Sequence, residues 1–466
     1  MPGPAATFSG RAATVALPLL VLAYLAAFAW RFADERLYAD SGYYLAQVVN
    51  GGGFRIEHGR WALALSQILP LLGVKAGASM SALILLHSLN NVAWLGLCML
   101  MAARGLKDAT ATAALAATHL IGLTHGLLCP IFELYYGVDL LILLLSARRS
   151  SRIRTPWRWP LLALLFLGAV SAHAMALMLA VALLAAERIW ENRRDTLLLV
   201  ASLAAYLLIH GARLSPYEKD SASFLLRATD GAALWSAMGP DSLLELAGYA
   251  ARHYPDVMLL AAWAAIALLM ARRWRQAMLL IGFLYVLHAL ITLKLQGFLH
   301  DRYREQLNFG AVAWVLLMLL RNAPSLRLSA LLPHALLAAL VFRMARAEWI
   351  APHYAERTHR IEQAIGSARE AGVSKGIIAA PLFFGPRHHA IDLSWSVPVE
   401  SLLLSSKYGP EGTVSIITAE DAAWPGATDH LDRLVFRRWD IVAAGWLNPR
   451  YFSAPQGRYL PLTAQP

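Results

Sequence analysis

The residues Ala33-Asp34-Glu35-Arg36-Leu37-Tyr38-Ala39-Asp40 form the first polar stretch of the chain, and they directly follow an apolar run from Ala13 to Phe32. That run has the length of about 20 residues that an α-helix needs to cross the hydrocarbon core of a bilayer. Three carboxylates therefore gather where a first spanning helix would leave the membrane. Clustered negative charge has little structural purpose there, so this loop is the first candidate for function.

The composition extends the apolar character to the whole chain. Of 466 residues, 58% are hydrophobic and 15% are charged, and the mean hydropathy is +0.49. These values predict a polytopic membrane protein. The net charge of +11 comes from arginines in short clusters between apolar runs, which favours the cytoplasmic membrane surface over nucleic acid as their partner. Two cysteines, both in or beside apolar segments, exclude a disulfide framework.

The first outer loop is predicted to extend from Ala33 to Ser79. Within it, the apolar spacing of Ser41–Asn50 is typical of an amphipathic helix in the membrane interface. Trp61–Val74 is apolar but too short to cross a bilayer, so we interpret it as a second interfacial or re-entrant helix. Arg11 and the apolar residues after it loosely resemble a cleavable signal, but the run is longer than such signals have, which favours an uncleaved helix.

An arginine-rich loop without acidic residues fixes the predicted orientation, because cytoplasmic loops carry an excess of basic residues. It contains Arg148, Arg149, Arg152, Arg154 and Arg158. The three apolar runs that separate it from the first outer loop are Met80–Ala103, Ala109–Leu128 and Ile131–Ala147. This count places the loop at 33–79 outside.

The run Pro160–Ala186 has two interpretations. It could be one tilted helix, or a hairpin of two short helices that breaks near Ser171 and His173. We prefer the hairpin because it keeps all later arginine clusters on the cytoplasmic side. The remaining predicted spans are Thr196–Gly211, Asp256–Ala271, Ala277–Leu295, Leu307–Leu320 and Leu328–Ala345.

The predicted fold is thus an all-α polytopic membrane bundle of about eleven spanning helices, with interfacial helices in the first outer loop. Residues 1–350 form this domain, and 212–255 form a second large outer loop. Residues 351–466 are expected to form a small extracytoplasmic α/β domain, because polar and turn residues increase there and short apolar runs resemble buried strands. These runs are Ile377–Ala380, Thr413–Thr418 and Arg433–Phe436.

The stretch Asp34–Ala39 resembles the Asp-Glu-x-x-Tyr-Ala opening of the first outer loop in the GT-C superfamily of membrane glycosyltransferases. The most similar branch contains lipid A aminoarabinose transferases and protein O-mannosyltransferases. The resemblance implies transfer of a sugar from a polyprenyl-phosphate donor to an unknown acceptor at the outer face of the cytoplasmic membrane of a cell envelope. It also implies that Asp34, beside Glu35, is the general base.

The chemistry of such a transfer needs a carboxylate to accept the proton of the acceptor hydroxyl and a cation to receive the departing phosphate. His300-Asp301-Arg302-Tyr303-Arg304 resembles the Arg-Tyr element near the carrier phosphate of the same superfamily, and guanidinium groups suit phosphate oxygens. The match is partial, because no proline-containing helix follows and Glu57–Trp61 stands where the aminoarabinose branch has Lys-Pro-Pro. The substrate-binding candidates are Tyr38, Asp40, Arg60, Glu133, His300, Arg302, Tyr303 and Arg304.

Each candidate also has a purely structural interpretation. Asp34 and Glu35 could cap an interfacial helix, and Asp40 could be an N-cap before Ser41. Arg302 and Arg304 could snorkel to the interface. Buried polar groups elsewhere, including Asp139 and the histidines at 119, 125 and 173, are expected to form hydrogen bonds between helices. No Asp-x-Asp or His/Cys cluster indicates a metal, although Asp34 and Glu35 leave a divalent ion open.

Two functions of other classes remain open from the sequence. The first is a transporter or flippase of a lipid-linked or small polar substrate, against which the chain lacks paired halves with matching broken helices. The second is a non-catalytic membrane scaffold. The glycosyltransferase interpretation is preferred because it alone uses both the acidic loop and the Arg-Tyr element.

Overall fold

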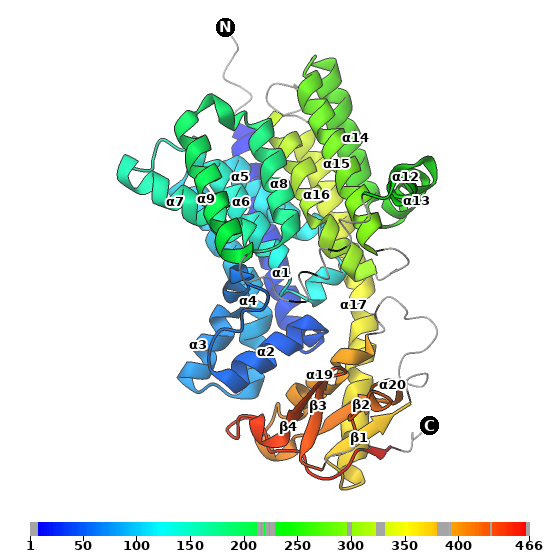
Figure 1. The fold of residues 1–466 in the computed structure, drawn as a ribbon. Helices are drawn as coiled ribbons and strands as arrows, with labels where there is room; N and C mark the ends of the chain where they lie inside the picture. Colours follow the sequence, from blue (N-terminus) through cyan, green and yellow to red (C-terminus); the bar gives the residue numbers. More distant parts are fainter. Residues whose placement is uncertain are drawn as a thin grey trace.

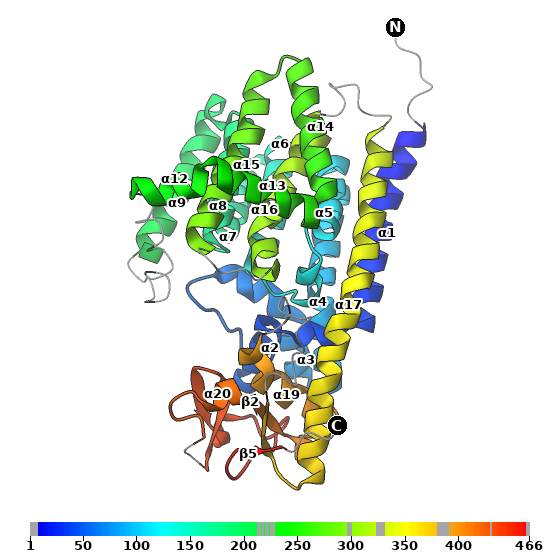
Figure 2. The ribbon, with the colours of Figure 1, turned by 90° about the vertical axis from the view of Figure 1, so that its right-hand side faces the viewer.

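The computed structural model describes residues 8–211, 229–295, 301–322, 331–379, 393–428 and 431–462, together with positions 216, 219, 223 and 391. The described chain has two main hydrophobic cores. One lies inside a helical bundle, and the other lies below it, where the first loop meets the C-terminal residues (Figure 1). The long helix α17 (Leu332–Glu370) connects them, and beside the bundle it runs along α1 (Phe8–Arg31) (Figure 2).

The bundle is built around α6 (Glu133–Arg149), in which every residue from Glu133 to Ala147 is buried. The flanking helices are α4 (Met80–Leu100), α5 (Ala109–Ile121), α7 (Thr155–Val170), α8 (Ala174–Ala186), α9 (Arg193–Gly211), α14 (Pro255–Met270), α15 (Trp274–Leu295) and α16 (Asp301–Asn322). Two shorter helices, α12 (Gly231–Met238) and α13 (Pro240–His253), lie at the side of the bundle within the predicted second outer loop (Figures 1 and 2).

Fewer helices qualify as membrane spans than the sequence predicts. Within the described ranges, three are long and apolar enough to cross a membrane: Met80–Gly105, Arg193–Gly211 and Trp274–Lys294. The helices from Gly231 to Met270 would add a fourth if they are taken together as one span, but they bend by 116°. A membrane location is consistent with these helices, and the predicted number of about eleven spans is not confirmed.

Two predicted segments break where polar residues interrupt them. The run 160–186 forms two helices, α7 and α8, on either side of Ser171–His173, as the hairpin interpretation predicts. The run 109–128 was predicted as one span, but α5 ends at Ile121 and a 3-10 turn covers His125–Leu128. The carboxylate of Glu305 accepts the amide N–H groups after that break, which compensates for the lost helical hydrogen bonds.

The lower core contains the first loop and the C-terminal residues together. The loop provides α2 (Asp40–Gly51), a 3-10 helix (Trp61–Gln67) and α3 (Ile68–Ala76), close to the two short helices that the sequence predicts. The C-terminal part has a parallel sheet in the order β2-β1-β5 and an antiparallel pair β3-β4. Its elements are β1 (Lys375–Ile378), α19 (Val397–Ser405), β2 (Ser415–Thr418), α20 (Ala419–Ala422), β3 (Arg433–Arg437), β4 (Asp440–Ala443) and β5 (Leu460–Pro461).

Polar contacts also join the loop to the C-terminal part. Asn448 donates from its side chain to the carbonyl of Val49 at 2.9 Å, and its backbone N–H donates to Asn50 at 2.9 Å. Arg450 donates to the carbonyl of Gly77 at 2.9 Å. The sequence predicts strands β1, β2 and β3 near their observed places, but it does not predict this shared core. The predicted boundary at residue 350 falls inside α17.

Candidate functional site

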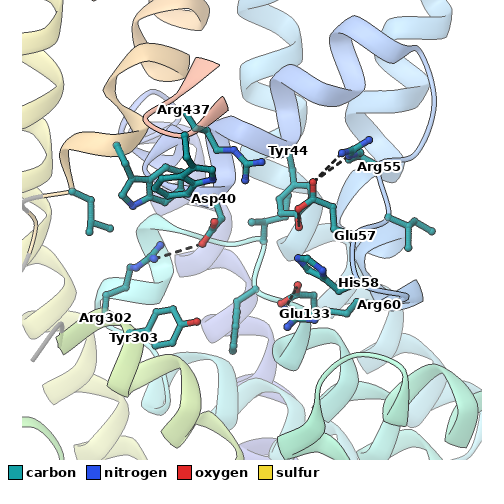
Figure 3. A pocket seen from close by; sticks show the side chains of 16 residues that line it. Asp40, Tyr44, Arg55, Glu57, His58, Arg60, Glu133, Arg302, Tyr303 and Arg437 are labelled. Carbon is teal, nitrogen blue, oxygen red and sulfur yellow. Dashed lines mark hydrogen bonds and ion pairs between the residues drawn. The ribbon is translucent and has the colours of Figure 1, made fainter. Parts of the chain in front are cut away.

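A cavity of about 710 Å³ lies between the bundle, the first loop and the C-terminal part (Figure 3). Side chains of four arginines and three carboxylates line it, together with a histidine and several aromatic rings. The lining residues are Asp40, Tyr44, Arg55, Ile56, Glu57, His58, Arg60, Ile131, Phe132, Glu133, Arg302, Tyr303, Leu393, Trp395, Arg437 and Trp439. Residues distant in sequence therefore meet at one place.

Asp40 and Arg302 form the central pair of this cavity. Their closest atoms, Oδ2 and Nη2, are 3.5 Å apart, and Figure 3 shows the two side chains directed toward each other. Arg302 is only 3% exposed, whereas the Asp40 side chain is 39% exposed. Nη1 of Arg302 donates to the sulfur of Cys129 at 3.1 Å, and its Nε has no hydrogen-bond partner in the described chain. The guanidinium thus keeps donor capacity at the edge of the cavity.

The backbone before Asp40 adopts a conformation that L-residues rarely take. Ala39 has φ 57° and ψ −129°, a region that favours glycine. Its amide N–H donates to Oε1 of Glu400 on α19 at 3.3 Å. A β-carbon on Gly42 would lie 2.4 Å from the carbonyl oxygen of Leu37, so only glycine fits at position 42 in the first turn of α2. These contacts place the Asp40 carboxylate at the mouth of the cavity.

Arg302 is held from behind by an aromatic ring and by the next turn of its own helix. Its guanidinium lies 5.4 Å from the ring centroid of Tyr38, and that of Arg357 lies 4.9 Å from the same ring. One turn further along α16, the buried carboxylate of Glu305 accepts the N–H groups of residues 124–126. The start of α16 is therefore fixed against the turn that precedes α6.

Glu57 organises the opposite side of the cavity. It accepts the hydroxyl of Tyr43 at 2.6 Å and that of Tyr44 at 3.3 Å, and it pairs with Arg55 at 3.1 Å. Burial alone would raise the pKa of Glu57. The Tyr43 hydrogen bond and the nearby guanidinium groups of Arg437 and Arg55 outweigh burial and lower it. Glu57 is thus an anion at neutral pH.

The C-terminal part supplies an aromatic wall, which we define as Trp395, Trp439 and Arg437. The two indole rings have centroids 5.4 Å apart and are tilted by 38°. Arg437 is the last residue of β3, and its guanidinium lies 3.8 Å from the ring centroid of Tyr43 and 5.7 Å from that of Trp439. The sequence does not single out any of these three residues as part of a site.

Asp34 and Glu35 lie elsewhere. They line a second cavity of about 490 Å³, which also contains Arg31 and Lys407. Oδ2 of Asp34 is 2.5 Å from Nζ of Lys407, and burial raises the pKa of Glu35 to about 7. Asp34, the base that the resemblance implies, therefore does not line the cavity of Arg302, where Asp40 pairs with Arg302 instead.

The other predicted substrate-binding residues divide into four groups. Arg60 and Glu133 line the larger cavity as an ion pair at 3.0 Å, and Tyr303 lines it too. Tyr38 is buried behind Arg302 and does not line it. Arg304 pairs with Glu245 of α13 at 2.8 Å, away from the cavity. His300 lies outside the described residues.

The acidic loop places carboxylates at helix starts, as the structural interpretation expects, with Glu35 in the first turn of its 3-10 helix and Asp40 in that of α2, but without side-chain capping. Asp34 precedes the 3-10 turn Glu35–Leu37, but its side chain makes no capping hydrogen bond. Ala39, not Asp40, stands at the N-cap of α2. The prediction for the buried histidines is confirmed at His119, which bonds Asp139 across helices at 2.9 Å, and at His125, which bonds Tyr354 at 3.1 Å. His173 instead caps the start of its own helix, α8.

No group of three or more His, Cys, Asp or Glu side chains that could hold a metal ion occurs in the described part of the chain. Comparisons with known protein families, with curated proteins and with solved structures find no match to this chain.

Proposed function

We propose that the protein is an integral membrane glycosyltransferase, resembling the GT-C superfamily, that transfers a sugar from a polyprenyl-phosphate donor to an acceptor hydroxyl at the outer face of the cytoplasmic membrane. The larger cavity is the active site in this proposal. Asp40 takes the role of general base, because it faces Arg302 in the larger cavity, whereas Asp34 faces Lys407 in the other one.

The proposed reaction is a single displacement. The acceptor oxygen bonds to the anomeric carbon, the bond from that carbon to the phosphate oxygen breaks, and Asp40 accepts the acceptor proton. The phosphate leaves with an additional negative charge, which Arg302 stabilises. Phosphate is already a good leaving group, so the minimal set is one carboxylate and one guanidinium on the same membrane face.

The observation that carries the proposal is the pairing of Asp40 with a buried, incompletely hydrogen-bonded Arg302 at a cavity of about 710 Å³. Burying a guanidinium is costly unless a partner or ligand compensates for its lost hydration. Here one carboxylate oxygen lies 3.5 Å from Nη2. A phosphate diester could occupy the cavity side of this guanidinium and accept hydrogen bonds from it.

The direct test supplies the purified protein with synthetic farnesyl-phosphoryl sugars and a membrane glycolipid extract, and it follows the release of farnesyl phosphate. We expect release that requires the acceptor extract and that is lost in Asp40→Asn. Release that persists in Asp40→Asn would remove the assigned base. Movement of the labelled lipid across proteoliposomes without any release would support a flippase instead.

A further inference from the structure

The aromatic wall is fixed in place by a second set of side chains behind it. Arg438, between the lining residues Arg437 and Trp439, does not itself line the cavity, and it donates to Asp421 and Glu420 at 2.7 Å each. It also donates to the hydroxyl of Ser394, which neighbours Trp395. Both indoles are therefore anchored through one arginine, which makes the wall a preorganised surface.

The wall combines apolar rings with free hydrogen-bonding capacity. Trp439 is 51% exposed although it lines a cavity. Beside it, Nε of Arg437 is buried and has no hydrogen-bond partner in the described chain. Glu57, within the electrostatic reach of Arg437, provides a carboxylate on the same cavity. The guanidinium and the carboxylate therefore offer polar partners beside the indole rings.

Resting on the proposed function, we propose that Trp395 and Trp439 hold the sugar of the donor, with a pyranose ring stacked on the indoles and its hydroxyls bonded to Arg437 and Glu57. The C–H bonds on one face of a pyranose make that face apolar, so it packs on aromatic rings while the hydroxyls at its rim need polar partners. The cavity offers both features side by side.

The charges of the cavity argue against the polyprenyl chain as the occupant of the wall. An isoprenoid chain needs an apolar surface without polar groups, because each polar group that it covers would lose hydration. The cavity has four arginines and three carboxylates among its lining residues. The wall also belongs to the C-terminal part, outside the bundle that holds the apolar helices (Figure 1).

The test measures binding by the full-length protein in detergent, with two kinds of phosphodiester of equal charge. The reference ligand is farnesyl methyl phosphate, and the others carry mannose, glucose or galactose in place of the methyl group. We expect at least one sugar ester to bind about tenfold more tightly than the reference. Trp439→Ala and Trp395→Ala should remove this difference and leave binding of the reference unchanged.

Trp424→Ala is the matched control, because Trp424 lies in the same part of the chain and is 44% exposed but does not line the cavity. Trp424→Ala should keep the full difference in affinity between the sugar esters and the reference ligand. Equal binding of the reference and all sugar esters by the unmodified protein would overturn the inference, as would equal weakening of both ligands in the tryptophan variants. If neither the unmodified protein nor an Arg302 variant binds the reference ligand, the proposed function is removed, and this inference with it.

Discussion

The amide N–H of Ala39 donates to the carboxylate of Glu400, 361 residues later in the chain, at 3.3 Å. The same carboxylate pairs with Arg357 of α17 and accepts the hydroxyl of Ser396 at 2.6 Å. One buried anion thus joins the residue before Asp40 to both the long helix and the C-terminal part. The geometry of the candidate base therefore depends on residues that no local sequence motif contains.

Glu400→Ala should destabilise the protein strongly. It leaves the buried guanidinium of Arg357 without its partner, and breaking a buried pair from one side costs about 3–5 kcal/mol. Thermal or denaturant unfolding followed by fluorescence measures the change. Replacing the pair together, by Glu400→Leu with Arg357→Met, should cost less than Glu400→Ala alone. If the double variant loses as much stability as Glu400→Leu and Arg357→Met lose separately when added together, the two residues are not coupled.

Ala39→Gly should stabilise the protein slightly. Relief of an unfavourable backbone conformation yields about 1–3 kcal/mol, whereas losing one buried methyl group costs about 0.8 kcal/mol. The opposite change at the neighbouring turn, Gly42→Ala, should destabilise because its β-carbon would meet the carbonyl of Leu37. The melting temperatures of Ala39→Gly and Gly42→Ala test these two predictions. A lower melting temperature for Ala39→Gly would contradict the proposed strain.

Glu35→Gln should change how stability depends on pH. Burial raises the pKa of Glu35 from 4.5 to about 7, with smaller contributions from the charges of Asp34 and Glu362 that raise it and of Lys407 that lowers it. The folded protein therefore retains this proton over a range where the unfolded chain has lost it, and Glu35 reduces stability as pH rises from about 4.5 to 7. The melting temperature of Glu35→Gln relative to the unmodified protein should increase across that range and then level off. A difference that does not change with pH would contradict this assignment.

Arg302→Lys should reduce sugar transfer about 100- to 1000-fold, the usual effect of removing a donor that stabilises developing negative charge. A lysine ammonium cannot reproduce the planar fork of arginine. Arg304→Lys is the matched control, because Arg304 lies two positions later on α16 and pairs with Glu245 outside the cavity. It should retain transfer within a few-fold. Comparable losses in both variants would argue against the assigned role of Arg302.

The sequence predicts the parts of this structure that depend on local pattern. Hydrophobic periodicity places α2 and the short helical segment from Trp61 to Ala76, and apolar runs bounded by turn residues place three strands. Ser171 and His173 correctly indicate the break between α7 and α8. The predicted number of membrane spans is not confirmed. Apolar runs in the sequence continue through breaks in the helices, such as the one after Ile121.

The candidate site is predicted only in part, because it forms through long-range packing. Arg302, Asp40, Arg60, Glu133 and Tyr303 all line the cavity. All but Glu133, which lies near the start of a predicted span, belong to segments that the sequence marks as polar beside an apolar run. Choosing between Asp34 and Asp40 needs the left-handed backbone at Ala39, which directs the chain into α2. The sequence does not predict the aromatic wall, because its residues come from separate segments in and around the β-strands.

Sugar transfer by Asp34→Asn and Asp40→Asn, measured side by side as release of farnesyl phosphate with folding checked by melting temperature, tests the central assignment most directly. We expect Asp40→Asn to reduce the activity about 100- to 10,000-fold, the range expected for a general base, and Asp34→Asn to retain most of it. Full activity in Asp40→Asn together with loss in Asp34→Asn would contradict this assignment and return the base to the smaller cavity.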